Sequence, residues 1–220
     1  MRKLILKMSL SADGFVGGPN GEMDWLFKTM DDGMTDWTVN KLWQAGLHIM
    51  GSRTFYDMSS YWPASTEPFA APMNEIPKVV FSRKGVIEPA DPFQSTSALK
   101  DAIRFRPEIF RTEPVYNIAV KNSPSVRTWT NYNIVSGDLT TEINRLKQED
   151  GKYILAHGGA SFARSLVEHG LIDEFILVIH PVLLGKGLPL FSTLPVPLYL
   201  ELKNTTNFKS GIIGNIYVPK

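Results

Sequence analysis

The chain of 220 residues is long enough for one large domain with a sizeable core. Its 23 Lys and Arg residues against 22 Asp and Glu residues give a formal net charge of +1, which argues against a nucleic-acid or membrane-surface binder driven by bulk charge. The absence of cysteine excludes disulfides, thiolate zinc sites and a cysteine nucleophile. With neither a signal peptide nor an apolar segment of about 20 residues, we expect a cytoplasmic protein without a membrane segment.

The first half of the chain predicts strands that alternate with loops and helices. Leu4–Leu10 is an apolar run typical of a buried strand, and a loop rich in glycine and polar residues follows over 11–24. A capping residue, Thr35 or Asp36, predicts a helix that ends near Ala45. Beyond it we expect strands over 47–50 and 79–82, a helix over 55–61 and an irregular loop over 63–77.

The second half predicts a sheet that ends in an antiparallel pair. The segment 84–133 shows no clear pattern, and we treat it as an irregular insertion. After it we expect a helix from Asp138, a strand over 152–156, a helix to His169, a strand over 175–179 and an antiparallel pair over 198–202 and 212–218. Residues 1–220 are therefore predicted to form one α/β domain with a mixed, mostly parallel sheet and helices on both faces.

The segment Gly158-Gly159-Ala160-Ser161 lies between a predicted buried strand and a predicted helix. Free backbone N–H groups at a helix start favour an anion, and glycines let a phosphate approach the backbone closely. A plain tight turn is the alternative, because the dinucleotide fingerprint with three glycines is absent. On its own the segment leaves both interpretations open.

Two more segments repeat this arrangement at predicted strand ends. Gly51-Ser52-Arg53-Thr54 precedes a helix that Thr54 could cap, and Arg53 could make two contacts with one phosphate. Ser82-Arg83 ends the next strand. Each segment alone could be a structural cap or a surface arginine. Because ligands of open α/β sheets bind at the C-terminal edge of the strands, the three segments together predict a multiply phosphorylated ligand such as a dinucleotide.

The order and spacing of four segments resemble the dihydrofolate-reductase superfamily, specifically its short bacterial branch that is similar to the reductase domain of riboflavin-biosynthesis enzymes. The segments are Ser9–Val16, Met50–Phe55, Val79–Arg83, and His157–Ala160 with its continuation through Gly170–Phe175 to Pro181–Gly187. They span nearly the whole chain except 84–133. The last segment is the most specific of the four.

This resemblance implies a dihydrofolate-reductase-like three-layer sandwich with an eight-stranded sheet, NADPH as cofactor, a small-molecule substrate and a homodimer. It also implies where the cofactor lies: Gly51, Ser52, Arg53 and Thr54 at the adenosine half, Arg53, Ser82 and Arg83 near the 2′-phosphate, Gly158, Gly159, Ala160 and Ser161 at the pyrophosphate with His157 before them, and Val16 and Gly17 beside the nicotinamide.

Two positions depart from the family pattern. Dihydrofolate reductases place a carboxylate on the helix after the first loop, and residues 25–30 contain none. Riboflavin-pathway reductases usually carry Glu before the Gly-Gly pair to recognise the substrate, where this chain has His157. The candidate catalytic carboxylates are therefore Asp13 and Asp24. Asp13 could instead hold turn amides, and Asp24 could cap a helix.

We therefore predict an NADPH-dependent reductase that transfers hydride to a planar heterocycle or to an imine- or carbonyl-like small molecule. One alternative is the riboflavin-pathway reductase that acts on 5-amino-6-(5-phosphoribosylamino)uracil. Another is a nucleotide-binding protein with the reductase fold and no turnover. Binding of NADPH without its oxidation across a panel of heterocycles would favour this last interpretation.

Overall fold

The computed structural model describes residues 1–85, 100–101, 104 and 129–220. In chain order its elements are β1 (Leu4–Ser11), α1 (Asp24–Thr29), α2 (Asp32–Trp43), β2 (Ala45–Gly51), α3 (Ser52–Tyr61), the 3-10 turn η1 (Trp62–Ala64), α4 (Ala70–Glu75), β3 (Lys78–Phe81), β4 (Tyr132–Val135), α7 (Leu139–Gln148), β5 (Tyr153–Ala156), α8 (Ala160–Glu168), β6 (Glu174–His180), β7 (Leu200–Asn207) and β8 (Ile213–Pro219).

The strands form one eight-stranded sheet in the order β4-β3-β2-β5-β1-β6-β8-β7. The first six strands of this order run parallel, and β8 and β7 close the sheet as an antiparallel pair. This confirms the predicted mixed, mostly parallel sheet of the dihydrofolate-reductase type. The parallel arrangement brings the carboxyl ends of β1, β2, β3 and β5 to one edge, where the loops of interest follow.

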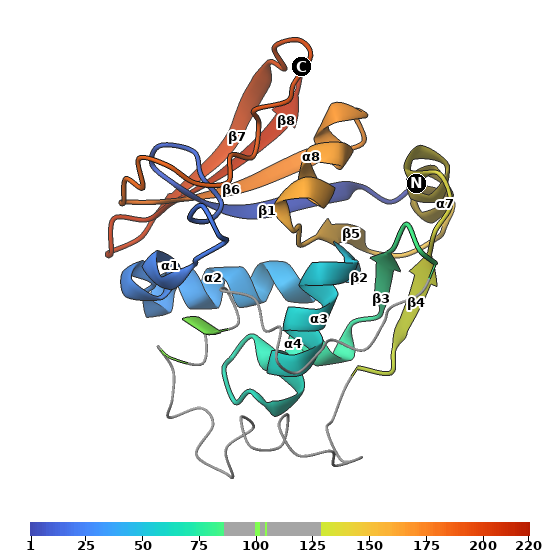
Figure 1. The fold of residues 1–220 in the computed structure, drawn as a ribbon, viewed down its shortest axis with the longest axis horizontal. Coiled ribbons are helices and arrows are strands. Elements are labelled where there is room, and N and C mark those ends of the chain that lie inside the picture. The colour runs from blue at the N-terminus through green and yellow to red at the C-terminus, as the bar shows by residue number, and fades with distance from the viewer. Residues whose placement is uncertain (86–99, 102–103, 105–128) are drawn as a thin grey trace.

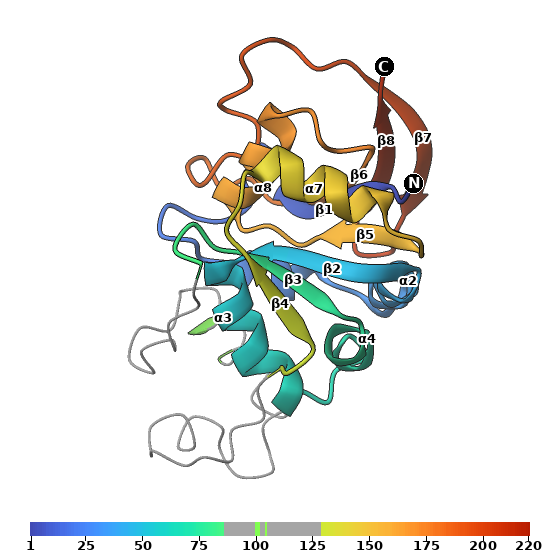
Figure 2. The same cartoon turned by 90° about the vertical axis from the view of Figure 1, so that its right-hand side faces the viewer.

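Helices cover the sheet on both faces (Figures 1 and 2). α7 and α8 lie on one face, and α2, α3 and α4 lie on the other, as the side view in Figure 2 shows. Two hydrophobic clusters fill the spaces between the layers. One contains Ile143 of α7 and Leu166 of α8, and the other contains Met34 of α2 and Phe55 of α3. These two layers on either side of the sheet make the predicted three-layer sandwich.

The alternation along β1 decides which residues face which layer. Leu4, Leu6, Met8 and Leu10 belong to the cluster under α7 and α8, whereas Ile5 belongs to the opposite cluster. Because successive side chains of a strand point to opposite faces, Lys7 and Ser9 lie on the same face as Ile5. The same alternation puts His48 of β2 on that face, since its neighbours Leu47 and Ile49 belong to the first cluster. We call it the α2–α4 face.

Several boundaries differ from the sequence-based expectation. The helix expected from Thr35 or Asp36 begins at Asp32, because the Asp31 side chain accepts a hydrogen bond from Met34 N at 2.8 Å and caps it there. Helix α3 begins at Ser52 with Gly51 at the capping position, so Thr54 lies inside the first turn and is not its cap.

Two elements were not expected at all. The loop predicted over 63–77 contains the short helix α4, and β4 begins at Tyr132, inside the segment treated as an irregular insertion. The remainder of that prediction, over 86–99, 102–103 and 105–128, lies outside the described residues. In the described part of the chain, no helix is long and apolar enough to cross a membrane.

Candidate functional site

The ends of β2 and β5 meet directly at the predicted cofactor edge. His157 N donates a hydrogen bond to Ile49 O at 3.0 Å, and Gly51 N donates to Gly158 O at 3.2 Å. Two of the three segments that the sequence singled out are therefore joined backbone to backbone. Each of these segments leads straight into a helix, α3 after Gly51 and α8 after Gly159.

The Gly158-Gly159 segment leaves no room for side chains. Gly158 has φ +89°, a conformation that favours glycine, and a Cβ there would lie 3.1 Å from Met8 Sδ. A Cβ on Gly159 would lie 3.1 Å from Thr54 Oγ1. The two helix starts are thus separated by little more than a hydroxyl group, and in the described residues no side chain caps either helix. Backbone N–H groups left free in this way suit the phosphates of a dinucleotide.

The third segment, Ser82-Arg83, follows β3, whose last residue Phe81 pairs with Gly51 of β2. Phe81, at the end of β3, contacts Phe162 of α8 with ring centroids 5.1 Å apart. Ser82 N donates to Val135 O at 2.9 Å, which continues the β3–β4 pairing by one residue. The Ser82 side chain is buried, whereas the Arg53 and Arg83 side chains are exposed. The structure therefore gathers the three predicted segments at the ends of β5, β2 and β3, with two arginines reaching into solvent.

The first loop packs against the segment that follows β6. Val16 N donates to Leu188 O and Leu188 N donates to Gly17 O, both at 2.9 Å. A Cβ on Gly187 would come within 2.2 Å of Gly17 O, so the two segments touch through their backbones. Val16 and Gly17 are buried and fixed in this position.

Asp13 holds the same two segments together from the other side. Its carboxylate accepts hydrogen bonds from Ser11 Oγ at 2.6 Å, from Gly185 N at 2.7 Å and from Leu184 N at 3.1 Å. The hydrogen bond from Ser11 is the main reason why the pKa of Asp13 lies below its ordinary value. Both oxygens therefore serve as acceptors for the protein itself, which matches the turn-binding alternative for this residue.

Asp24 is the first residue of α1 and does not cap it, since Met23 occupies the capping position. The Asp24 carboxylate pairs with Lys28 Nζ at 2.5 Å, one helical turn along. This hydrogen bond lowers the pKa of Asp24. In the structure, then, each of the two carboxylates proposed from the sequence already has a partner within the protein.

Sequence reasoning missed the basic residues of the α2–α4 face. Lys7 stands in the middle of β1, and the register that pairs Leu6 with Ala156 places it beside His157, immediately before the Gly-Gly pair. Burial lowers the pKa of Lys7 to about 8. One signal was present: Lys7 is the single charged residue of its strand.

Three histidines share this face with Lys7. His48 and His157 pack edge to face with ring centroids 4.5 Å apart, and His180 packs against Trp25 of α1 at 5.1 Å. Burial, with the Lys7 charge second, lowers the pKa of His157 to about 3 and that of His180 to about 4. The three imidazoles are therefore neutral at physiological pH.

The described residues contain no group of three or more His, Asp or Glu side chains that could hold a metal ion. The candidate site contains neutral imidazoles, one lysine and two helix starts with glycines, which follow the adjacent parallel strands β2 and β5. The mixed eight-stranded sheet with helices on both faces defines an α/β protein of the dihydrofolate-reductase type. The chain belongs to the RibD C-terminal domain family, whose model matches residues 2–213.

Relatives of similar length support this assignment. The chain is 31% identical over 216 residues to the uncharacterized protein YyaP of Bacillus subtilis (strain 168), covering 98% of this chain and 94% of YyaP. Among solved structures, a protein of Shewanella sp. PV-4 described as a riboflavin biosynthesis protein has a TM-score of 0.65 at 20% identity, covering 100% of this chain and 99% of that chain. Dihydrofolate reductase of Enterococcus faecalis shares the fold at 9% identity, with a TM-score of 0.50 and coverages of 99% and 96%.

Proposed function

We propose that this protein is an NADPH-dependent reductase of a small molecule. Membership of the RibD C-terminal domain family supports an oxidoreductase. The observation that carries the cofactor is the contact between two helix starts: Gly51 N bonds to Gly158 O, and a Cβ on Gly159 would reach Thr54 Oγ1. When bound, NADPH supplies a hydride. The protein contributes free helix-start amides for the phosphates. It also contributes a fixed first loop, whose Val16 and Gly17 lie beside the nicotinamide in this proposal.

Arg53 and Arg83 favour NADPH over NADH in this proposal. Both side chains are exposed beside the helix starts, and in the described residues neither arginine makes a hydrogen bond or an ion pair. A guanidinium group can bind the 2′-phosphate with two parallel hydrogen bonds, which NADH cannot accept. Each such contact contributes roughly 1.5–3 kcal/mol, enough for at least about tenfold discrimination.

The test measures the dissociation constants of NADPH and NADH for the full chain, followed by NADPH oxidation across a panel of heterocycles, imines and carbonyl compounds. We expect NADPH to bind at least about tenfold more tightly. Equal affinities would contradict the cofactor assignment. NADPH binding with no oxidation by any panel compound would instead favour the non-catalytic nucleotide-binding protein.

The uracil reductase of riboflavin biosynthesis is the second candidate. It is favoured by the family and by a structural neighbour at 16% identity, the bifunctional deaminase/5-amino-6-(5-phosphoribosylamino)uracil reductase of Thermotoga maritima, of which the chain covers 57%. Against it stands His157, where the resemblance implies a glutamate that recognises the substrate. We expect poor turnover of this substrate, with a specificity constant below roughly 10⁴ M⁻¹s⁻¹.

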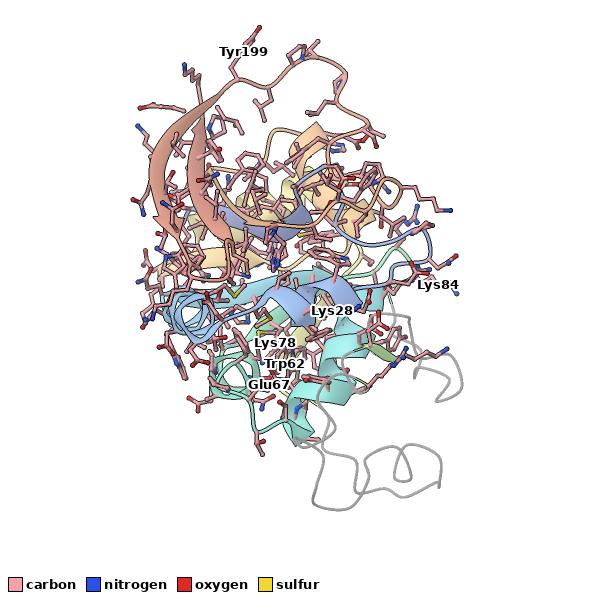
Figure 3. The ribbon with its side chains drawn as sticks, turned by 90° about the vertical axis from the view of Figure 1, so that its left-hand side faces the viewer. Lys28, Trp62, Glu67, Lys78, Lys84 and Tyr199 are labelled. Atoms are coloured by element: carbon pink, nitrogen blue, oxygen red, sulfur yellow. The ribbon has the colours of Figure 1, made fainter. Side chains whose placement is uncertain are left out.

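We also propose that the protein is a homodimer joined through the β7 edge of the sheet. β7 is the last strand in the sheet order, and Val196, Leu198, Tyr199 and Leu202 are exposed in or just before it. Tyr199 projects away from the body of the protein (Figure 3). Among the described strands β7 has a neighbour on one side only, and such an edge with exposed apolar side chains is suited to pairing with a second copy. Light scattering tests this by measuring the mass of the wild type, which we expect to be a dimer, and of Leu202→Lys, which we expect to be a monomer. A monomeric wild type would contradict the proposal.

A further inference from the structure

The first loop contains the single Asn-Gly pair of the chain, Asn20-Gly21. Asparagine followed by glycine is the dipeptide most prone to spontaneous deamidation, because glycine has no Cβ to hinder its backbone nitrogen from approaching the asparagine side chain. Asn20 is exposed. Among the described residues, a Cβ built on Gly21 would meet one atom within 4 Å, Leu188 Cδ1. The pair is therefore open to water and little of the protein packs against it.

Deamidation at this pair needs only the chain itself and water. The backbone nitrogen of Gly21 loses its proton and bonds to Cγ of Asn20, and the side-chain nitrogen takes up a proton and leaves as ammonia. The succinimide ring that results then adds a water molecule, which breaks one of its two C–N bonds. Breaking the new bond gives aspartate. Breaking the original peptide bond gives isoaspartate, in which the backbone runs through the side-chain carbonyl.

Two hydrogen bonds of the loop tip, residues 18–22, have to open before the ring can close. Gly21 N donates to Gly18 O at 3.0 Å, and Asn20 Nδ2 donates to Glu22 Oε1 at 2.7 Å. The second bond is exposed to solvent. Because water replaces such bonds when they break, their net contribution to stability is small. We therefore expect the loop tip to open often enough for deamidation to proceed over days.

The modification changes the charge at a place where the loop tip depends on an amide. The Glu22 carboxylate accepts hydrogen bonds from Asn20 N at 2.9 Å and from Asn20 Nδ2 at 2.7 Å. The side-chain hydrogen bond is the main reason why the pKa of Glu22 lies below its ordinary value. An aspartate at position 20 has no side-chain N–H to donate and adds a second negative charge. The contact between the two side chains then becomes repulsive.

The loop tip is in contact with the part of the loop that the proposed function assigns to the nicotinamide. A Cβ on Gly17 would lie 3.4 Å from Gly21 Cα, and Gly18 N donates to Glu22 O at 2.9 Å. The backbone of Gly17 therefore rests directly on the loop tip. Isoaspartate would in addition insert an extra carbon atom into the backbone at position 20. Either product alters the support of Gly17.

We propose that Asn20 is a site of spontaneous deamidation and that this modification weakens the binding of NADPH. The second part rests on the proposed function, because it needs the cofactor to lie beside the first loop, whereas the modification itself does not. Molecules of this protein then differ in cofactor affinity according to their age, with no change in the encoded sequence.

The first experiment follows the modification itself. The full chain is incubated at 37 °C and at pH 6, 7.5 and 9, then digested, and mass spectrometry detects the change in mass when the Asn20 amide becomes an acid. We expect the modified fraction to rise with time, and faster at higher pH, because the attacking nitrogen must lose its proton. Asn144, exposed on α7 and followed by Arg145, is the internal control and should stay unmodified. An Asn20 peptide that stays as unmodified as the Asn144 peptide would overturn the inference.

The second experiment connects the modification to the cofactor through variants. Asn20→Asp reproduces the aspartate product and should bind NADPH about three- to tenfold more weakly than the freshly purified wild type. Asn20→Gln keeps an amide but would have to close a larger ring, so its affinity should stay constant during incubation while that of the wild type falls. Asn144→Asp is the matched control, since it makes the same change of charge on α7 and should bind NADPH like the wild type.

The two parts of the proposal fail in different ways. Equal NADPH affinities of the wild type and Asn20→Asp would overturn the effect on the cofactor. If Asn20→Asp does not fold, the comparison of fresh and aged wild type decides the same question. A freshly purified wild type that does not bind NADPH would refute the proposed function, and the mass spectra would still decide whether Asn20 is modified.

Discussion

The predicted cofactor edge and the α2–α4 face of this sheet are built from different parts of the chain. At the predicted cofactor edge the backbone forms the candidate site, because the segments Gly51–Thr54 and Gly158–Ser161 approach each other closely where strands end and helices start. On the α2–α4 face the chemistry lies in single side chains in or directly after the strands, namely Lys7, His157 and His180. The first kind of site is local in sequence. The second exists only once strands far apart in sequence lie side by side.

The largest effect is expected for Gly159→Val, which places a side chain between the helix starts at Gly51–Thr54 and Gly158–Ser161. The new Cβ would lie 3.1 Å from Thr54 Oγ1, and the added methyl groups would fill the space between the two helix starts. We expect NADPH affinity to fall at least about 100-fold while the protein stays folded. Thermal melts check this, because a ligand at 100 times its dissociation constant stabilises a protein by about 2.7 kcal/mol.

The apo melting curve of Gly159→Val serves as its folding control. A midpoint close to that of the wild type shows that the sheet and α8 have formed. An undiminished rise of the midpoint with NADPH in this variant would exclude the Gly-Gly segment from the cofactor site.

A second prediction separates Lys78, which is buried, from Lys7, which is partly exposed, on the α2–α4 face. Lys78→Met removes three donated hydrogen bonds and leaves buried acceptors unpaired, so we expect a loss of about 2–4 kcal/mol in the free energy of unfolding. Urea unfolding at pH 7 measures it. A loss below about 0.5 kcal/mol would mean that the acceptors around Lys78 are satisfied without it, and would weaken the contrast with Lys7.

A third prediction concerns the exposed side chains at the cofactor edge. Arg53→Ala should reduce the preference for NADPH over NADH by about tenfold, mainly through weaker NADPH binding. Fluorescence titrations with both cofactors measure the ratio. Arg145→Ala is the matched control, since Arg145 pairs with Glu142 and Glu149 on α7 and should leave the ratio unchanged. An unchanged ratio in Arg53→Ala would shift the 2′-phosphate contact to Arg83.

The contrast explains which features could be predicted from the sequence. Apolar runs predicted most of the strands and the mixed character of the sheet, and Gly-Gly before a helix marked the predicted backbone site, because both are short-range patterns. The predicted start of α2 was wrong because a cap can be any of several polar residues. Here Asp31 caps the helix by accepting a hydrogen bond from Met34 N. Lys7 was overlooked because its meaning depends on His157, which only the register of β1 with β5 brings near.

The same logic explains Asp13 and Asp24. Both lie in or next to a glycine-rich loop, where a carboxylate is equally suited to chemistry and to holding backbone amides. Only the folded structure brings Asp13 to the amides of Leu184 and Gly185, residues that are 171 and 172 positions away. The catalytic roles proposed for these two carboxylates remain predictions, and the structure gives each of them another partner.

The smallest effect is expected for Lys7→Met in the absence of ligand, and its sign is opposite to that of Lys78→Met. Burial lowers the pKa of Lys7 to about 8, whereas the unfolded chain has the ordinary value near 10.4. Between these values the unfolded state binds more protons, so Lys7 makes the protein less stable as the pH falls from 10.4 to 8, and below pH 8 this penalty is fully present.

Methionine fills a similar volume without a charge. Lys7→Met should therefore stabilise the protein at pH 7 by about 1 kcal/mol, a value discounted for the partial exposure of Lys7, and this gain should shrink toward zero by about pH 10. Urea unfolding of the wild type and Lys7→Met at pH 7, 8, 9 and 10 measures it, with Lys3→Met as the exposed control. A destabilised Lys7→Met at pH 7 would show that Lys7 already has a partner inside the protein, and the difference between the two lysines of this face would disappear.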